Sequence, residues 1–291
     1  MPNRQKIREV LADIAAELSQ SRWPVDVEDV ARTLGIRVEV IAESGSQPAA
    51  HLSMRGRPTI AIRTSAFADP HKDNFNRFSI AHEIGHWIIW RRFGLLPARN
   101  GEYWEHERLC NEFAANLLVP ITILSRHLQT LHQRRVHPLH YPRSVAVAAE
   151  VSWQVAARSI AAIPDCADWY VRISLNGDPR VLITCSTVQE CDNYVGDRAK
   201  ISDIDLSNSI RELHIGKIVN MPLSFIAGSF RIRSGGAFVL RERAQRATIL
   251  FPKRSTEIVR LTANDATRQS ATIPILTAPS KMPEEINSPG T

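Results

Sequence analysis

The first part of the chain shows two hydrophobic periods in succession. Apolar residues within 3–19 recur every three or four positions, which predicts an amphipathic helix. A second, shorter helix is predicted from Asp26 to Leu34, because Gly35 supplies a typical helix stop. Runs of β-type residues then predict strands at 36–41, 50–54 and 58–62. We therefore expect two helices followed by a small sheet.

Two stronger helices are predicted next. The first begins at Asp73 or Asn74, either of which can cap a helix, and no proline interrupts it before Pro97. The second covers 104–118 and has a clear apolar stripe. Residues 121–143 carry many His and Arg side chains, and we predict a loop or weak helix there. A solvated basic face is favoured for this segment over a site for an anionic partner.

The pattern of residues 144–162 predicts a helix, a turn and a second helix, with Ser152 capping the second. In this second helix only Gln154 and Arg158 offer polar surface, which is too little for a helix that reads the major groove. We expect this helix-turn-helix-like segment to pack on the preceding domain, and we do not expect direct DNA binding.

From about Asp165 the hydrophobic period changes to two. Alternation at 169–175 and 180–185, separated by the turn-forming residues 176–178, predicts a β-hairpin. Further strands are predicted at 229–233, 237–241, 247–251 and 257–261. Residues after Asn264 are rich in Pro, Ser and Thr, which is typical of a disordered tail.

These patterns together predict an α+β protein with four parts. The parts are a first domain at 1–143, the helix-turn-helix-like segment at 144–163, a β-rich α+β C-terminal domain at 164–263 and a disordered tail at 264–291.

The composition indicates which class of protein this is, but it says little about the function. The 291 residues are 44% hydrophobic, and no apolar run approaches the roughly 20 residues that span a bilayer. The first residues lead into an amphipathic helix instead of a signal peptide, so we expect a cytoplasmic protein without a membrane segment. The four cysteines include no Cys-x-x-Cys pair, which argues against a disulfide scaffold or a cysteine-based zinc site. The net charge of +6 favours acidic partners only weakly.

The most specific motif is His82-Glu83-Ile84-Gly85-His86, inside the predicted long helix. Residues four apart lie on the same helix face, so both imidazoles can reach one zinc ion while Glu83 acts on water beside it. Gly85 weakens a helix by about 1 kcal/mol relative to alanine, which indicates that another segment packs closely against it. The alternative is a buried helix with two hydrogen-bonded core histidines. The motif predicts the core of a zinc peptidase.

A catalytic zinc usually has three protein ligands and one open position. A third histidine on the same helix is excluded, because Ile89 and Arg92 replace the Gly and His of the metzincin pattern. The remaining candidates lie at the start of the next helix: Glu102, Glu105, His106, Glu107 and Glu112.

Helical geometry separates these candidates. Glu107 projects from the edge of the buried face, whereas Glu105 and Glu112 align with the polar side of the helix. We therefore predict Glu107 as the third ligand and keep His106 as the alternative. Asn111, one turn further on, is placed to hydrogen-bond the outer nitrogen of a ligand histidine.

With these residues, the chain resembles the ImmA/IrrE-type zinc metallopeptidases over about residues 20–162. The matching stretches are Arg77 to His86, read as RFSIAHEIGH, and Glu107 to Pro120, read as ERLCNEFAANLLVP. Many peptidases share the bare zinc motif, but the Asn-x-Phe-Ala-Ala-x-Leu-Leu-x-Pro ending is specific to this family.

The resemblance implies a zincin-like metallopeptidase core in which His82, His86 and Glu107 bind Zn²⁺ and Glu83 is the catalytic base, with Mn²⁺ as a possible substitute in vitro. Characterised members are cytosolic proteases that cleave a helix-turn-helix repressor and so relieve repression of stress-response or mobile-element genes. We therefore expect such a repressor as the protein substrate. Some relatives carry a GAF-like C-terminal domain, which we expect here.

Two other classes of function are compatible with the sequence. One is a regulator in which the zinc is structural and the C-terminal domain binds a ligand, and the other is a toxin-antitoxin partner that acts through binding alone. The intact Glu83 argues against a structural zinc, which has no use for a carboxylate beside an open position. An oxyanion donor for the peptidase is expected among Tyr103, His106 and His51.

Overall fold

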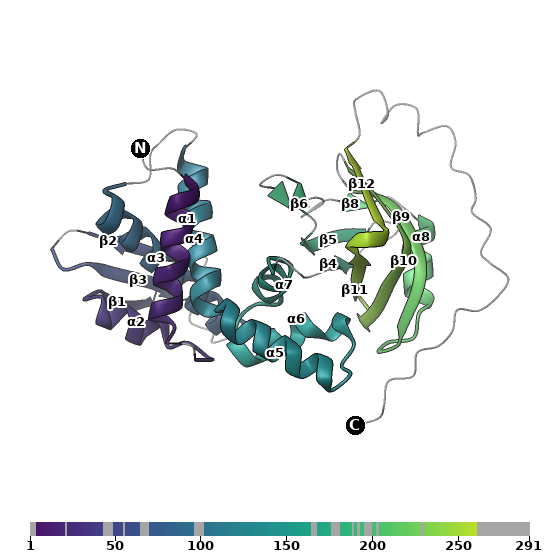
Figure 1. The fold of residues 1–291 in the computed structure, drawn as a ribbon, viewed down its shortest axis with the longest axis horizontal. Coiled ribbons are helices and arrows are strands. Elements are labelled where there is room, and N and C mark those ends of the chain that lie inside the picture. Colours follow the sequence, from purple (N-terminus) through teal and green to yellow (C-terminus); the bar gives the residue numbers. More distant parts are fainter. Residues whose placement is uncertain are drawn as a thin grey trace. The chain divides into compact units, whose positions relative to one another are not determined.

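The computed structural model gives a mixed α+β fold, as predicted (Figure 1). It describes residues 4–20, 22–42, 49–54, 56–64, 70–95, 102–163, 168–175, 181–187, 189–190, 193–194, 200–201, 204–227 and 230–260. The chain divides into two compact units. The first is Met1–Val136 with His140–Ile160, and the second is His137–Leu139 with Ala161–Thr291. The finer predicted division at 143, 163 and 263 stays a prediction, and the predicted tail lies outside the described residues.

The N-terminal elements match the predicted order of two helices and a small sheet. They are α1 (Arg4–Leu18), α2 (Val27–Thr33), β1 (Arg37–Ala42), β2 (Ala49–Ser53) and β3 (Thr59–Thr64). Asp26 caps α2, because its carboxylate accepts hydrogen bonds from the backbone N–H groups of Glu28 and Asp29. Strand β3 is central in the sheet, parallel to β1 and antiparallel to β2. The three predicted strands therefore form one sheet, in which β2 and β3 pair with each other.

Two long helices form the centre of the first unit, α3 (Pro70–Phe93) and α4 (Glu102–Leu118). Helix α3 begins earlier than the predicted Asp73 or Asn74, because Pro70 fits the first turn, where no backbone N–H is needed. The side chain of Asp73 is outside the described part of the chain. Helix α3 ends where Gly94, at φ +66, donates from its backbone N–H to the Trp90 carbonyl oxygen at 2.8 Å.

Helix α4 packs against both α3 and α1. Its inward face matches the prediction, because Phe113, Ala114, Leu117 and Leu118 are all buried. On its other side, Glu105 is 2.8 Å from the Arg4 guanidinium. Glu105 therefore faces α1, through an ion pair on the polar side of α4 on which it was predicted to lie.

Gly85 lies where α3 packs closely against α4. A Cβ at this position would be 3.1 Å from Cδ1 of Phe113 and 3.2 Å from the backbone Cα of Cys110. The predicted close packing against Gly85 is therefore confirmed. A neighbouring backbone atom cannot rotate away as a side chain can, so a methyl group at this position requires α4 to shift by a few tenths of an ångström.

We expect Gly85→Ala to lower the free energy of unfolding of the first unit by about 1 kcal/mol, since overpacking of about 1–3 kcal/mol outweighs the gain in helix propensity. Calorimetry of the metal-free protein measures this change. Gly235→Ala is the control, because its Cβ would meet nothing within 4 Å. A more stable Gly85→Ala protein would show that the helix interface has room for a methyl group.

Of the loop or weak helix predicted at 121–143, the first half is helical and more regular than predicted. Helix α5 (Ile121–Gln133) is regular there, followed by the short 3-10 helix η1 (Pro138–His140). Leu124 and Leu131 lie two turns apart, and both are buried. Burial of this apolar edge stabilises a helix whose other faces are polar.

The predicted helix-turn-helix-like segment is present as α6 (Tyr141–Ala149) and α7 (Trp153–Ala161). Ser152 caps α7, since its Oγ accepts from the Val155 backbone N–H at 3.2 Å. The turn is fixed to α3 by Arg77, whose guanidinium donates to the carbonyl oxygens of Ala149 and Glu150. This contact holds the segment against the helix that carries the His82-Glu83-Ile84-Gly85-His86 motif.

The second unit is dominated by strands. Its elements are β4 (Asp168–Ser174), β5 (Val181–Ser186), β6 (Gln189–Glu190), β7 (Asn193–Tyr194), β8 (Lys200–Ile201), α8 (Ile204–Glu212), β9 (Ile218–Ala227), β10 (Phe230–Arg243), β11 (Arg246–Pro252), η2 (Lys253–Ser255) and β12 (Thr256–Arg260). Strands β4 and β5 pair antiparallel, as predicted, although the turn at 176–178 is not among the described residues. Helix α8 and strand β9 were not predicted.

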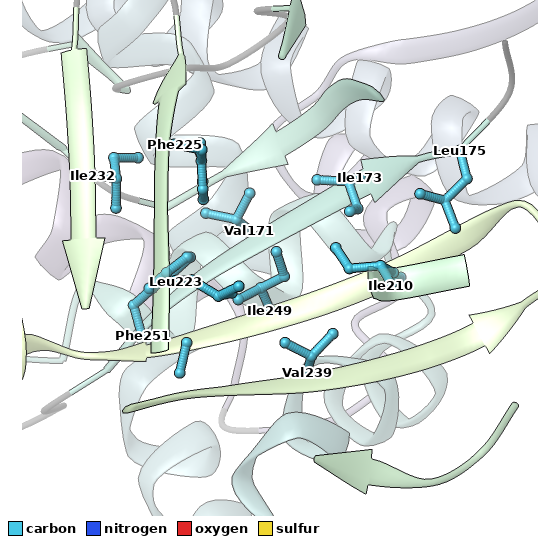
Figure 2. Packing of buried hydrophobic residues seen from close by; sticks show 12 residues of the cluster. Val171, Ile173, Leu175, Ile210, Leu223, Phe225, Ile232, Val239, Ile249 and Phe251 are labelled. Atoms are coloured by element: carbon cyan, nitrogen blue, oxygen red, sulfur yellow. The ribbon is translucent and has the colours of Figure 1, made fainter. Parts of the chain in front are cut away.

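Within the described residues, this unit contains a seven-stranded sheet in the order β12-β10-β11-β4-β5-β8, with β9 on β10. Figure 2 shows its apolar core, in which Ile210 of α8 lies among side chains of the strands. The strands predicted at 229–233 and 237–241 are one strand, β10. Its pairing with β9 shifts register between Ser234 and Ala237, so the two intervening glycines produce an irregularity instead of a turn.

Among the helices that the structure describes, none combines the length and the apolar character needed to cross a membrane.

Candidate metal centre

His82 and His86 lie on one face of α3, one turn apart. Their Nε2 atoms are 3.0 Å apart, and their ring centroids are separated by 4.8 Å. Both side chains are largely shielded, with exposed fractions of 15% and 11%. The helix therefore presents two imidazole nitrogens to the same point, as the four-residue spacing predicts.

Glu107 of α4 reaches that point from the neighbouring helix. One carboxylate oxygen is 3.2 Å from Nε2 of His82, and the other is 3.3 Å from Nε2 of His86. Of the predicted ligand candidates, Glu105 pairs with Arg4 and Arg108, and Glu112 pairs with Arg8 and Arg108. The Glu102 side chain is outside the described part of the chain. The structure thus brings His82, His86 and Glu107 together.

The donor set fits a zinc ion. Zinc–ligand bonds of about 2.0–2.1 Å in tetrahedral geometry place neighbouring donor atoms about 3.3 Å apart. The three separations between the donor groups here are 3.0, 3.2 and 3.3 Å. Two imidazoles and one carboxylate are also a ligand set that catalytic zinc sites use, with the fourth position left open.

The outer nitrogens of both histidines are occupied by side chains of α4. Nδ1 of His82 is 3.0 Å from Oδ1 of Asn111, which is the contact predicted for Asn111. Nδ1 of His86 is 3.0 Å from Nε2 of His106. An amide oxygen only accepts hydrogen bonds, so His82 carries its proton on Nδ1 and offers the lone pair of Nε2 to the centre.

Burial favours the neutral forms of His86 and His106. Desolvation, with smaller contributions from His82 and His106, lowers the pKa of His86 to about 3. Burial also lowers the pKa of His106, although the nearby Glu107 carboxylate opposes that shift. Neutral imidazole is the form that binds a metal ion, so these groups need no deprotonation near neutral pH.

Glu83 lies beside the centre and is held by the edge of the sheet. Its Oε2 accepts a hydrogen bond of 3.1 Å from the backbone N–H of Leu52 in β2. Burial raises the pKa of Glu83 to about 7; the Leu52 hydrogen bond opposes this, and the Glu107 charge adds to it. A carboxylate with a pKa near neutrality is suited to take and return protons.

Cys110 is a further member of this cluster, although the cysteine spacing argued against a cysteine-based zinc site. Ligand atoms of Cys110, His82 and His86 all lie within 4.8 Å of one another, and the cysteine is fully buried. Burial raises the pKa of its thiol. Its position one turn beyond Glu107 on the same helix face was the available signal.

The remaining predicted residues are placed as follows. Tyr103 packs against Trp104 at the exposed start of α4, and His51 is exposed on β2. His106 is buried against His86 instead of facing Glu107 as an alternative ligand. None of these positions identifies an oxyanion donor.

Comparisons with known proteins add little. No family model and no curated protein matches this sequence. Among solved structures, a Mycobacterium tuberculosis transcriptional regulator is similar with a TM-score of 0.48 and 14% identity, over 86% of this chain and 80% of that one. A likeness this distant carries no conclusion about the function of this chain.

Proposed function

We propose that this chain is a zinc-dependent endopeptidase of the ImmA/IrrE type. The convergence of His82, His86 and Glu107 on one point, with Glu83 beside it, is the observation that carries the proposal. The three side chains would hold Zn²⁺, with Mn²⁺ as a substitute in vitro. In this proposal, helices α3 and α4 and the small sheet form a zincin-like core.

The residues of the chain have separate tasks in peptide hydrolysis. Bound zinc would supply Lewis acidity toward the scissile carbonyl and toward water. Glu83 takes a proton from the attacking water and delivers it to the leaving amine. The Leu52 N–H keeps one oxygen of Glu83 fixed, so that the other remains available for proton transfer. Asn111 holds His82 in the tautomer that directs Nε2 to the metal.

The proposed substrate is a helix-turn-helix repressor in the cytoplasm, whose cleavage would relieve repression of stress-response or mobile-element genes. The close attachment of α6 and α7 to α3 through Arg77 supports a packing role for this segment over DNA reading. The β-rich second unit is proposed to be a GAF-like sensor domain.

A second candidate function is favoured by Cys110. If its thiol completes the ligand set with His82, His86 and Glu107, the zinc is closed to substrate and structural, which is typical of a non-proteolytic regulator or a binding partner. Glu83 beside the centre favours the peptidase.

The test is cleavage of a helix-turn-helix repressor encoded next to this chain's gene. We expect the purified protein loaded with zinc to cut the repressor at a defined site, and a chelator to abolish cutting until zinc or manganese is restored. Mass spectrometry identifies the products. A zinc-loaded protein that forms a stable complex without cutting, or that neither cuts nor binds, would overturn the proposal.

A further inference from the structure

Helix α4 supplies more to the metal centre than the ligand Glu107. Two further side chains of α4 contact the histidines at the ring nitrogens that do not face Glu107. Each of the two side chains contacts a different histidine. Asn111 contacts Nδ1 of His82, and His106 contacts Nδ1 of His86, both at 3.0 Å. A histidine that binds zinc through one nitrogen usually donates a hydrogen bond from the other, which fixes its ring orientation and tautomer.

We propose that His106 is the positioning residue of the metal centre for His86: it accepts the Nδ1 proton of His86 on its own Nε2 and thereby directs Nε2 of His86 to the metal. This inference rests on the proposed zinc site. It assigns to His106 a role other than a metal ligand or an oxyanion donor.

Geometry supports this role over direct ligation. The nitrogen of His106 that lies near the centre faces Nδ1 of His86, the nitrogen that points away from Glu107. The two rings are nearly parallel, with centroids 5.0 Å apart and planes inclined by 15°, which suits a hydrogen bond that lies in the ring planes. His106 is only 7% exposed, so packing restrains its ring. A ligand role for Nε2 of His106 would require this nitrogen to give up its contact with Nδ1 of His86.

Proton positions explain why a neutral histidine suits this place. Metal binding requires the lone pair of His86 Nε2, so the ring proton of His86 must be on Nδ1. The partner of Nδ1 must then be an acceptor, and His106 is an acceptor at Nε2 when its own proton is on Nδ1. With this arrangement neither His86 nor His106 needs a second proton, so the pair adds no positive charge beside the metal.

The test compares two substitutions of His106. In His106→Leu the acceptor is lost at similar volume, and in His106→Gln an amide oxygen can still accept from His86. We expect His106→Leu to weaken zinc binding about 10–100-fold in a chelator-competition titration, and His106→Gln to recover most of the affinity. Asn111→Leu is the reference for the other histidine. His127→Leu is the control, since His127 contacts Ser144 in the same unit.

A second measurement uses the unaltered protein and therefore does not depend on a variant that folds. Long-range ¹H–¹⁵N spectra of the zinc-loaded protein report the tautomer of each imidazole. We expect a protonated Nδ1 and an unprotonated, metal-free Nε2 for His106. A protonated Nε2, or a zinc-bound His106, would overturn the inference.

The outcomes separate this inference from the proposed function. Unchanged zinc affinity in His106→Leu, with weakened affinity in Asn111→Leu, overturns the role of His106 and leaves the metal site standing. A protein that shows the expected zinc affinities and tautomers but cuts no substrate supports the inference and contradicts the peptidase. A full-length protein that binds no zinc overturns both.

Discussion

Replacement of Glu83 by Gln should lower the rate of repressor cleavage by about 10²–10⁴-fold while zinc remains bound. The amide is nearly the same size as the carboxylate, and its oxygen can still accept the hydrogen bond from the Leu52 backbone N–H. It cannot take a proton from water near neutral pH. The loss should therefore fall on the catalytic step and not on the fold or on metal binding.

Two measurements on Glu83→Gln check this expectation: single-turnover cleavage of the repressor and zinc content by atomic spectroscopy. Glu39→Gln is a matched control, because Glu39 is an exposed carboxylate of β1 in the same unit, paired with Arg37. Retained proteolysis in Glu83→Gln would remove the catalytic assignment. Loss of zinc from this variant would instead show that Glu83 supports the metal.

Replacement of Glu107 by Ala should release the metal. Glu107 contributes one of three converging donor groups, and its two oxygens lie 3.2 and 3.3 Å from the two histidine nitrogens. Zinc affinity should fall by more than the about 10–100-fold that follows loss of an outer hydrogen-bond partner. Cleavage should fall with zinc occupancy and recover in part when zinc is supplied in excess.

The matched control is Glu105→Ala, which removes a carboxylate of the same helix that pairs with Arg4 and Arg108. Zinc titrations of the two variants should diverge, with Glu105→Ala resembling the unaltered protein. A fully metallated Glu107→Ala protein would require another third ligand. Cys110 would then be the first candidate, because its thiol already lies near both histidines.

The two long helices α3 and α4 and the meeting of the histidines with Glu107 were predictable, because both follow from the spacing of residues along a helix. A motif on one helix fixes two nitrogens on one face, and the apolar stripe of the next helix separates Glu107 from Glu105. The residues that contact these side chains from other elements could not be predicted from the sequence. The Leu52 contact with Glu83 depends on where the edge of the sheet meets α3, and no residue pattern encodes that position.

In two segments the local sequence pattern predicted a less regular structure than the chain forms, because tertiary packing decides the conformation there. The segment of α5 is rich in residues with modest helix propensity, and burial of Leu124 and Leu131 decides its structure. In β10, Gly235 and Gly236 are typical turn residues, yet the strand continues through them. A Cβ at Gly236 would be 3.2 Å from Oδ1 of Asn220 in β9, so the small residue serves a close strand contact.

The chain enters the second unit twice. Residues His137–Leu139 belong to that unit, where the Tyr170 hydroxyl donates to the carbonyl oxygen of Pro138 at 3.2 Å, and the chain then returns to the first unit for α6 and α7. Neither unit is a continuous stretch of sequence. A fragment that starts at Ala161 would lack the Pro138 acceptor, and one that stops at Val136 would lack the turn held by Arg77. Gene truncation, the usual route to an isolated catalytic domain, therefore removes structural contacts from whichever half is kept.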